Sequence, residues 1–266
     1  MRDLNGRRVL LTGATGGIGQ AIARAMHGRG AHLVLTGRRA EVLEELAAEL
    51  GDRVEAVPAD LASADELRGL VERAGAVDVL VANAALPASG SLDSFSPGEL
   101  DRALDVNLRT PMHLTHALAP GMVDRGSGHL VYISSLSAKV VSGGGAVYSA
   151  TKAGLRAFAL GARDDLHGTG VGVTTVFPGF ISDAGMWAEA GLKLPPGVGT
   201  RRPEQVADAV LKGIERNRAE IDVAPPGLRV AAKLGLVAPS ATAAVMRRAG
   251  SEELSRALAD AQKPKR

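Results

Sequence analysis

Short apolar runs and amphipathic helical patterns alternate along most of this chain, and that alternation limits its possible folds more than any other feature. The pattern predicts about seven strands, at 8–12, 32–36, 54–57, 77–82, 131–133, 171–177 and 221–224. Leucines at helical spacing, capping residues and alanine-rich runs predict helices between them. Neighbouring parallel strands need such crossovers, so we expect one doubly wound α/β domain, a parallel sheet with helices on both faces.

Composition limits the chemistry and the setting. With 266 residues, 45% of them hydrophobic, the chain can bury a sizeable core in one domain. It has no cysteine, which excludes a disulfide scaffold, a thiol nucleophile and cysteine zinc sites. The net charge is +2, and we expect no nucleic acid partner. The N-terminus does not resemble a secretory signal and no uncharged run is long enough to span a bilayer, so we expect a cytoplasmic protein.

The turn after the first strand is rich in glycine. It reads Gly13-Ala-Thr-Gly-Gly-Ile-Gly19 and leads into an alanine-rich helix. Glycines let a backbone approach a pyrophosphate closely, and the amides and dipole of a helix N-terminus favour an anion. The turn is therefore a candidate phosphate-binding site, although its Gly-x-x-x-Gly-x-Gly spacing differs from the common dinucleotide fingerprint.

Three residues able to carry out proton chemistry follow the fifth strand. Ser135 lies at its end, and Tyr148 and Lys152 are four residues apart on the next helix, so they share a face. An ammonium close to a phenol favours the phenolate and lowers the tyrosine pKa from about 10. We predict that Tyr148 exchanges a proton with a substrate oxygen that Ser135 holds by a hydrogen bond.

Other candidate residues also follow strands directly. They are Asp60, Asn83 and Pro178, in addition to the glycine turn and Ser135. The carboxyl ends of parallel strands share one edge, where such sheets bind ligands. We therefore expect these residues to converge there.

Two further segments bear on this edge. The segment 180–200 mixes apolar residues with prolines and glycines, which favours a lid or pocket wall. The segment 226–266 carries eight basic and three acidic residues. We interpret it as a basic helical tail that is solvated or packs against another subunit.

Taken together, these motifs resemble those of the short-chain dehydrogenase/reductase family over about residues 7 to 224. The resemblance is carried by Thr12-Gly13-x-x-x-Gly17-Ile18-Gly19, Asp60, Asn83-Ala84, Asn107, Ser135, Tyr148-x-x-x-Lys152 and Pro178-Gly179. It implies a Rossmann-like catalytic domain over 1–225 that binds NAD(H) or NADP(H). The implied reaction is hydride transfer between the nicotinamide and a carbonyl or secondary alcohol.

The resemblance also implies roles for single residues. Asn107 would hold a water that passes protons onward. Lys152 would bind the nicotinamide ribose and lower the pKa of Tyr148. The expected catalytic residues are therefore Asn107, Ser135, Tyr148 and Lys152. Expected cofactor contacts are Gly13, Thr15, Gly16, Gly17, Ile18, Gly19, Arg38, Arg39, Asp60, Leu61, Asn83, Ala84, Ala85, Tyr148, Lys152, Pro178, Gly179 and Ile181. Two motifs differ from the family pattern: Ala82 and Ala85 flank Asn83-Ala84, where Asn-Asn-Ala-Gly is common, and Asp183 replaces a common threonine.

The end of the second strand favours NADP(H) over NAD(H). An NAD site places an acid there to bind the ribose 2′-hydroxyl. This chain has Thr36-Gly37-Arg38-Arg39 and no acid before Glu41. A guanidinium can instead bind a 2′-phosphate, and we expect Arg38 to do so, with Arg39 as its second partner.

The apolar lid suggests a lipophilic small-molecule carbonyl or alcohol as substrate. By resemblance, the helix that carries Tyr148 and the helix before it would pair two subunits. Apolar residues on these helices, Leu104, Leu108, Leu155, Phe158 and Leu160, predict a homodimer or homotetramer.

Three other interpretations compete with this one. Ser149-x-x-Lys152 matches a hydrolase motif, but its companion motifs are absent. His113 and His116 could bind a metal, but no carboxylate or cysteine set accompanies them, so we expect no metal site. A non-catalytic redox sensor would need the dinucleotide pocket but not the Ser135, Tyr148 and Lys152 set.

Overall fold

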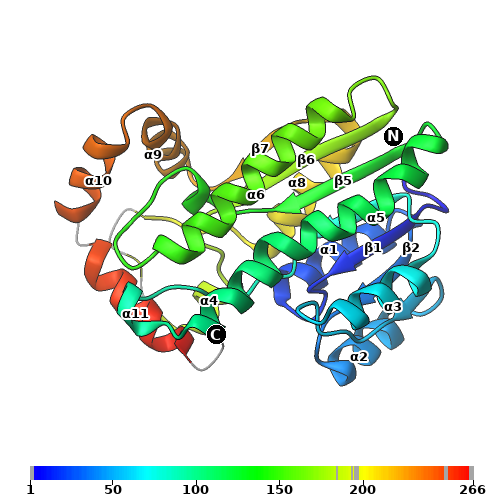
Figure 1. Cartoon of the computed structure of the whole chain (residues 1–266), viewed down its shortest axis with the longest axis horizontal. Helices are drawn as coiled ribbons and strands as arrows, with labels where there is room; N and C mark the ends of the chain where they lie inside the picture. The colour runs from blue at the N-terminus through cyan, green and yellow to red at the C-terminus, as the bar shows by residue number, and fades with distance from the viewer. Residues whose placement is uncertain (1–2, 184, 193, 195–197, 249–250, 264–266) are drawn as a thin grey trace.

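The computed structural model describes residues 3–183, 185–192, 194, 198–248 and 251–263. It confirms the predicted doubly wound fold (Figure 1). Seven parallel strands form one sheet in the order β3-β2-β1-β4-β5-β6-β7. They are β1 (Arg8–Thr12), β2 (His32–Thr36), β3 (Val54–Ala56), β4 (Val79–Ala82), β5 (Gly128–Ile133), β6 (Val171–Pro178) and β7 (Glu220–Val223). The order reverses between β1 and β4, which is where such sheets open a crevice for a ligand.

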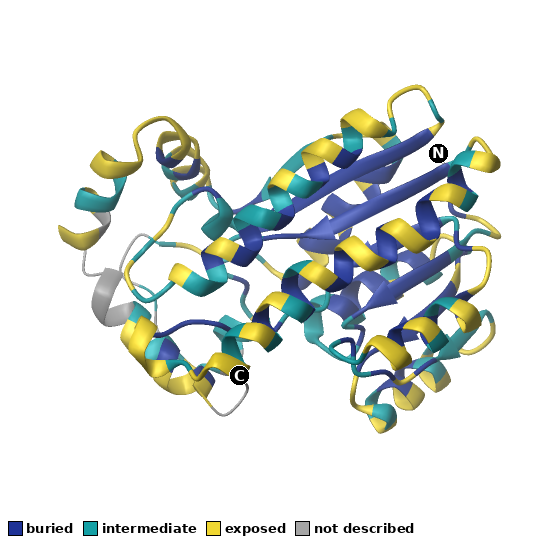
Figure 2. Cartoon of the chain, viewed as in Figure 1, coloured by how far each residue is buried: buried dark blue, intermediate teal, exposed yellow. Residues whose placement is uncertain are grey.

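Helices cover both faces of the sheet. The helices α1 (Gly17–His27), α2 (Ala40–Leu50) and α8 (Pro203–Arg216) pack on one face, and α3 (Ala64–Ala74), α5 (Thr110–Asp124) and α6 (Ala146–Asp165) on the other. Alternate strand residues serve the two cores: Leu11 packs with the first set and Leu10 with the second. Figure 2 shows the strands buried between helices whose outer faces are exposed.

The helical stretch from Pro97 to Asp124 is interrupted. It consists of α4 (Pro97–Leu104), a π-helical turn at Asp105–Arg109 (η2) and α5. Ser96 and Glu99 form a capping box at the start of α4. At the start of α3, Ser63 accepts from the Glu66 amide, but the Glu66 side chain accepts from the backbone amide of Asp60 at 2.8 Å instead of completing a box.

The remaining elements lie beyond the carboxyl edge of the sheet. They are η1 (Leu92–Ser94), η3 (Leu136–Ala138), α7 (Gly185–Glu189) in the predicted lid, α9 (Pro226–Val237), α10 (Pro239–Arg248) and α11 (Ser251–Gln262). The predicted lid and tail also include residues 184, 193, 195–197, 249–250 and 264–266, which lie outside the described residues. Among the helices described, none is long and apolar enough to cross a membrane.

The predicted pairing surface needs correction. Leu155 is 1% exposed and packs in the core, and the Phe158 ring lies edge-on against Tyr132. Both residues point inward because the helix packs this face on the sheet. The predicted Leu104 and Leu160 are exposed, and Met112 of α5 is a further large apolar side chain exposed on these helices.

Candidate active site

The carboxyl ends of the strands open into one large cavity of about 1160 Å³. It is lined by every predicted catalytic and cofactor-binding residue except Asn107. These residues come from the segments that follow six strands and from the helices α1 and α6, and they meet at one edge of the sheet. The parallel topology thus brings together what the sequence placed after successive strands.

Close packing shapes the glycine turn. A Cβ atom on Gly19 would lie 2.2 Å from the Gly13 carbonyl oxygen, and one on Gly13 would lie 2.7 Å from the Ala84 Cα atom. Gly13 also has a φ of +65°, a conformation that favours glycine. No side chain caps the N-terminus of α1 at Gly16. The first amides of α1 therefore remain available to an anion.

A network between β1 and β4 fixes this turn. The Thr12 hydroxyl oxygen accepts from the backbone amides of Asn83 and Ala84, both at 3.0 Å. The Asn83 side-chain amide donates to the carbonyl oxygens of Thr12 and Gly13, also at 3.0 Å. Asn83, predicted as a cofactor contact, thus supports the turn directly.

Two arginines line the cavity after β2. Arg39 donates to the Thr15 carbonyl oxygen at 2.5 Å, and so connects this loop to the glycine turn. Arg38 is exposed and close enough to Asp60 to lower its pKa. A glycine at position 37 avoids a crowded contact, because a Cβ atom there would lie only 3.1 Å from the Thr15 side chain.

Asp60 is held by a residue that sequence reasoning missed. Arg102 of α4 donates to its carboxylate at 2.9 Å and also lines the cavity. Burial would raise the pKa of Asp60, but hydrogen bonds from Arg102 and the Ala62 amide, together with the charge of Arg38, hold it below its usual range.

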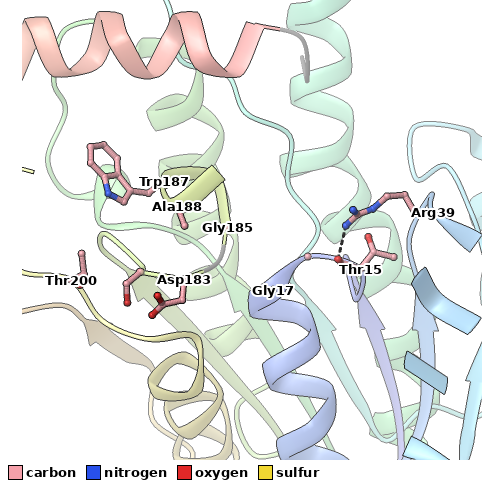
Figure 3. Close-up of a pocket in the computed structure, with 10 residues that line it drawn as sticks. Thr15, Gly17, Arg39, Asp183, Gly185, Trp187, Ala188 and Thr200 are labelled. Atoms are coloured by element: carbon pink, nitrogen blue, oxygen red, sulfur yellow. Dashed lines mark hydrogen bonds between the residues drawn. The ribbon is translucent and has the colours of Figure 1, made fainter. Parts of the chain in front are cut away.

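A smaller cavity of about 640 Å³ lies between the glycine turn and the lid (Figure 3). Gly17 and Arg39 line one side, and Trp187 and Thr200 belong to the lid side. Asp183, where the family commonly has threonine, lies on the lid side with a φ of +62°. The predicted lid therefore borders the phosphate-binding turn as well as the main cavity.

Ser135, Tyr148 and Lys152 all line the main cavity. Ser135 and Tyr148 are joined by a side-chain hydrogen bond. The Lys152 ammonium donates to the Ile133 carbonyl oxygen at 3.0 Å and lies 5.7 Å from the centre of the Tyr148 ring. A buried hydroxyl, Ser134, donates to the Lys152 carbonyl oxygen and joins the end of β5 to α6.

Burial dominates the electrostatics of this group. Burial raises the pKa of Tyr148 to about 12, and the hydrogen bond with Ser135 only partly offsets it. Burial also lowers the pKa of Lys152 to about 8. The Lys152 ammonium is directed to the Ile133 carbonyl oxygen, and the lowering of the tyrosine pKa by Lys152 stays a prediction. Residue spacing placed both groups on one face but did not fix the direction of the lysine side chain.

Asn107 lies in the π-helical turn and is fully buried. Its side-chain oxygen accepts from the Leu86 amide at 2.7 Å, and its nitrogen donates to the Leu86 carbonyl oxygen and to Thr151. The side chain thus joins the loop after β4 to the helix that carries Tyr148. The water-holding role that the resemblance implied stays a prediction.

The C-terminal tail forms part of the cavity, which corrects the prediction that it is only solvated or packs between subunits. Leu228 and Ala232 of α9, and Leu258 and Gln262 of α11, line the wall. Long-range packing of this kind leaves no local signal in the sequence.

One buried cation supports the loop that carries Ser135. Lys139 follows η3 and forms ion pairs with Asp222 at 2.8 Å and Glu220 at 3.0 Å. Its ammonium also lies 3.8 Å from the centre of the Phe177 ring. These contacts hold η3 against β6 and β7. Neither Lys139 nor Arg102 stood out in the sequence, because their partners are distant along the chain.

The predicted absence of a histidine metal site stays a prediction. His113 and His116 are both exposed on α5. Among the described residues, no group of three or more histidine, cysteine or acidic side chains is placed to hold a metal ion.

Comparison with known proteins gives consistent matches. A family model described as short chain dehydrogenase matches residues 7–194. The ketoacyl reductase HetN of Nostoc sp. is 36% identical over 230 residues, covering 84% of this chain and 80% of that protein. A short-chain dehydrogenase from Sphingobium yanoikuyae in complex with NADPH is 30% identical with a TM-score of 0.77, covering 91% of this chain and 95% of that one. A metagenomic short-chain oxidoreductase in complex with NADP is 33% identical with a TM-score of 0.71, covering 84% and 98%.

Proposed function

The chain belongs to the short-chain dehydrogenase/reductase family and is an NAD(P)-dependent oxidoreductase, and from this premise we propose that it transfers a hydride between NADP(H) and a lipophilic ketone or secondary alcohol. The observation that carries the proposal is the meeting of Ser135, Tyr148 and Lys152 with the glycine turn in one cavity.

The residues present fit a dinucleotide. Gly13 and Gly19 let the turn pack closely against its neighbours, and no side chain caps the first amides of α1, so these amides can bind a pyrophosphate. Lys152 lies beside Tyr148 at the end of β5, where it would bind the nicotinamide ribose. When bound, NADP(H) supplies or accepts the hydride.

The loop after β2 supports a preference for NADP(H). It places two guanidinium groups, Arg38 and Arg39, on the cavity wall and no acid. An acid at this place would repel a 2′-phosphate, whereas a guanidinium binds one. Two similar structures contain NADPH or NADP, which agrees with this assignment.

Tyr148 is the proton donor in the reducing direction. At neutral pH it is protonated, because burial holds its pKa at about 12. Ser135 is hydrogen-bonded to it, so a carbonyl oxygen between the two hydroxyls would accept from both. Hydride addition to the carbonyl carbon then needs one proton on the oxygen, and the Tyr148 hydroxyl provides it. The reverse sequence oxidises the alcohol.

The walls beyond these residues support a lipophilic substrate. Leu136 and Val140 follow the end of β5, and Met186, Trp187 and Leu228 extend the apolar wall. The similarity to a ketoacyl reductase places β-ketoacyl thioesters first among the compounds to test. Lipophilic ketones without a thioester come next.

The test follows NADPH oxidation by absorbance with purified protein. A panel of β-ketoacyl thioesters and lipophilic ketones identifies a substrate, and Tyr148→Phe is then compared on it. We expect kcat to fall at least about 100-fold, because only the transferable proton is lost. NADPH affinity and thermal unfolding should stay close to those of the unmutated protein.

The chain offers a matched control. Tyr132, its only other tyrosine, is fully buried and hydrogen-bonded to Thr115 at 2.6 Å. Tyr132→Phe should lower stability by about 1 kcal/mol and leave turnover in place. If Tyr148→Phe turns over as fast as Tyr132→Phe, the assigned proton donor is wrong.

We also propose that the protein forms a homodimer or homotetramer. Leu104, Met112 and Leu160 are exposed on α4, α5 and α6. These apolar side chains would be removed from water if two copies paired through these helices.

A further inference from the structure

The last turn of α11 brings an amide side chain into the main cavity. Gln262 is 4% exposed, and with Ser255 and Leu258 it lies on the face of α11 that lines the cavity. The wall it joins includes the apolar residues Met186 and Leu228. An amide in such a place is costly unless both of its ends have partners.

Among the described residues, only one end of this amide has a partner. The Gln262 nitrogen Nε2 donates to the carbonyl oxygen of Met186 at 3.4 Å. A carbonyl oxygen can only accept, so this contact fixes which end carries the hydrogens. The other end, Oε1, is buried and has no hydrogen-bond partner among the residues that the structure describes. Native proteins keep few such atoms, and each calls for an explanation.

We infer that Gln262 Oε1 accepts a hydrogen bond from the substrate, which therefore carries an amide N–H or a hydroxyl group in addition to its reacting carbonyl. This inference rests on the proposed function, because the same cavity would hold the substrate. Gln262 becomes a specificity determinant, far in sequence from the proton donor Tyr148. A substrate that lacks the donor would leave a buried oxygen unpaired, which is how polar sites reject analogues.

The oxygen of Gln262 distinguishes substrates with a hydrogen-bond donor from those without one more sharply than the nearby hydroxyl groups do. Ser137 Oγ also lines the cavity, is buried and lacks a partner among the described residues. A hydroxyl can donate or accept, so it tolerates either kind of substrate group. The Gln262 oxygen can only accept, and its nitrogen is already engaged by Met186.

Two pairs of probes isolate the donor. The first pair is a β-ketoacyl N-acetylcysteamine thioester, which carries an amide N–H, and its analogue with an ester oxygen in place of that N–H. The second pair is a long-chain methyl ketone with a terminal hydroxyl group and its methyl ether. The reacting carbonyl is the same within each pair. We expect kcat/KM to be about 5- to 30-fold higher for the donor member of at least one pair.

Variants then locate the effect. Gln262→Leu keeps the side-chain volume and removes the acceptor, so the ratio within the responding pair should fall to about one. Ser255→Ala is the matched control on the same face of α11. The Ser255 hydroxyl already contacts Ser142 at 3.4 Å, so this change should preserve the ratio. The difference should lie mainly in KM, since Gln262 is not placed at the reacting atoms.

The outcomes separate this inference from the proposed function. Turnover of any probe supports the function; equal kcat/KM within both pairs, or a ratio that survives Gln262→Leu, overturns the inference alone. A rise in the Kd for NADPH in Gln262→Leu would overturn it too, because Oε1 would then serve the cofactor. If no probe is turned over, thermal unfolding without substrate decides. Gln262→Leu also loses the Nε2 contact with Met186. An oxygen reserved for substrate therefore predicts a fall in Tm no larger than that of Tyr132→Phe, which also loses one hydrogen bond. A larger fall would show a structural amide.

Discussion

Substitution of Arg38 tests how the protein would distinguish NADP(H) from NAD(H). The two cofactors differ only in the 2′-phosphate, and the loop after β2 provides the guanidinium groups that would bind it. Arg38 has no hydrogen bond to the glycine turn in the described structure, whereas Arg39 is bonded to the Thr15 carbonyl oxygen. Arg38→Ala therefore removes the charge with little disturbance of the turn. Arg39→Ala also disturbs the turn, which both cofactors would share.

The size of the effect follows from the contact. A hydrogen bond to a charged group contributes about 1.5 to 3 kcal/mol, or roughly ten- to a hundredfold in affinity. Arg38 is exposed, so solvent screening places its contribution near the lower end of that range. We expect Arg38→Ala to raise the Kd for NADPH about tenfold and to leave the Kd for NADH nearly unchanged. Arg39→Ala should weaken binding of both.

Fluorescence titration of the unmutated protein and each variant with NADPH and NADH measures these constants. Arg73→Ala is the charge-matched control, since Arg73 is exposed and pairs with Glu55 at 3.1 Å. It should leave both constants unchanged. Equal affinities for the two cofactors in the unmutated protein, or tighter NADH, would show that these arginines do not bind the 2′-phosphate. An equal loss for both cofactors in Arg38→Ala would refute its assigned selectivity.

Two further predictions concern stability and assembly. Burial lowers the pKa of Lys152 from 10.5 to about 8, so the folded chain releases this proton at lower pH than the unfolded chain. The resulting stability is fully present above pH 10.5 and is lost as the pH falls through 8. Between pH 8 and pH 10, the free energy of unfolding measured with urea should rise by at most about 3 kcal/mol. Tyr148 has the opposite effect on stability, but only at higher pH. Lys152→Met should lack this rise, and an equal rise in the variant would contradict the assignment. Light scattering at micromolar concentration should show a dimer or tetramer. Leu160→Asp should weaken this assembly, because Leu160 is exposed on α6. A monomeric unmutated protein would refute the proposal.

Much of the fold was predictable because its signals are local. The helix α8 begins at Pro203 and ends at Arg216, and proline at a first helical position is such a signal. The strands β1 and β2 have their predicted bounds. The π-helical turn after Leu104 was not predictable, since hydrophobic periodicity does not reveal one extra residue in a turn.

The site was predictable as a set of residues but less so as a set of interactions. Parallel topology alone brings residues after successive strands to one edge, so membership of the cavity followed from the order of elements. The partners did not follow. Arg102 reaches Asp60 across 42 positions in sequence, and Lys139 reaches Asp222 across 83. Such contacts depend on how α4 and η3 pack, which no local pattern records.

The tail shows the same limit more strongly. Its composition predicted a basic, solvated segment, and Arg229 and Lys233 of α9 are indeed exposed. The same helix presents Leu228 and Ala232 to the cavity, so its two faces serve different surroundings. Net charge describes only the outer face. The role of the inner face depends on where α9 packs, at the wall of the cavity.

The protonation of Tyr148 connects the geometry with the direction of the chemistry. A buried phenol with a pKa of about 12 holds its proton at neutral pH and so suits donation to a reduced carbonyl oxygen. Accepting a proton from an alcohol requires the phenolate, which burial disfavours unless positive charge lies beside the ring. Lys152 is the cation available on the same face of α6, but here its ammonium is bonded to Ile133. The lysine would have to turn from that carbonyl toward the phenol before it could favour oxidation. We therefore expect Tyr148 to act as the proton donor when a carbonyl is reduced, beside Ser135.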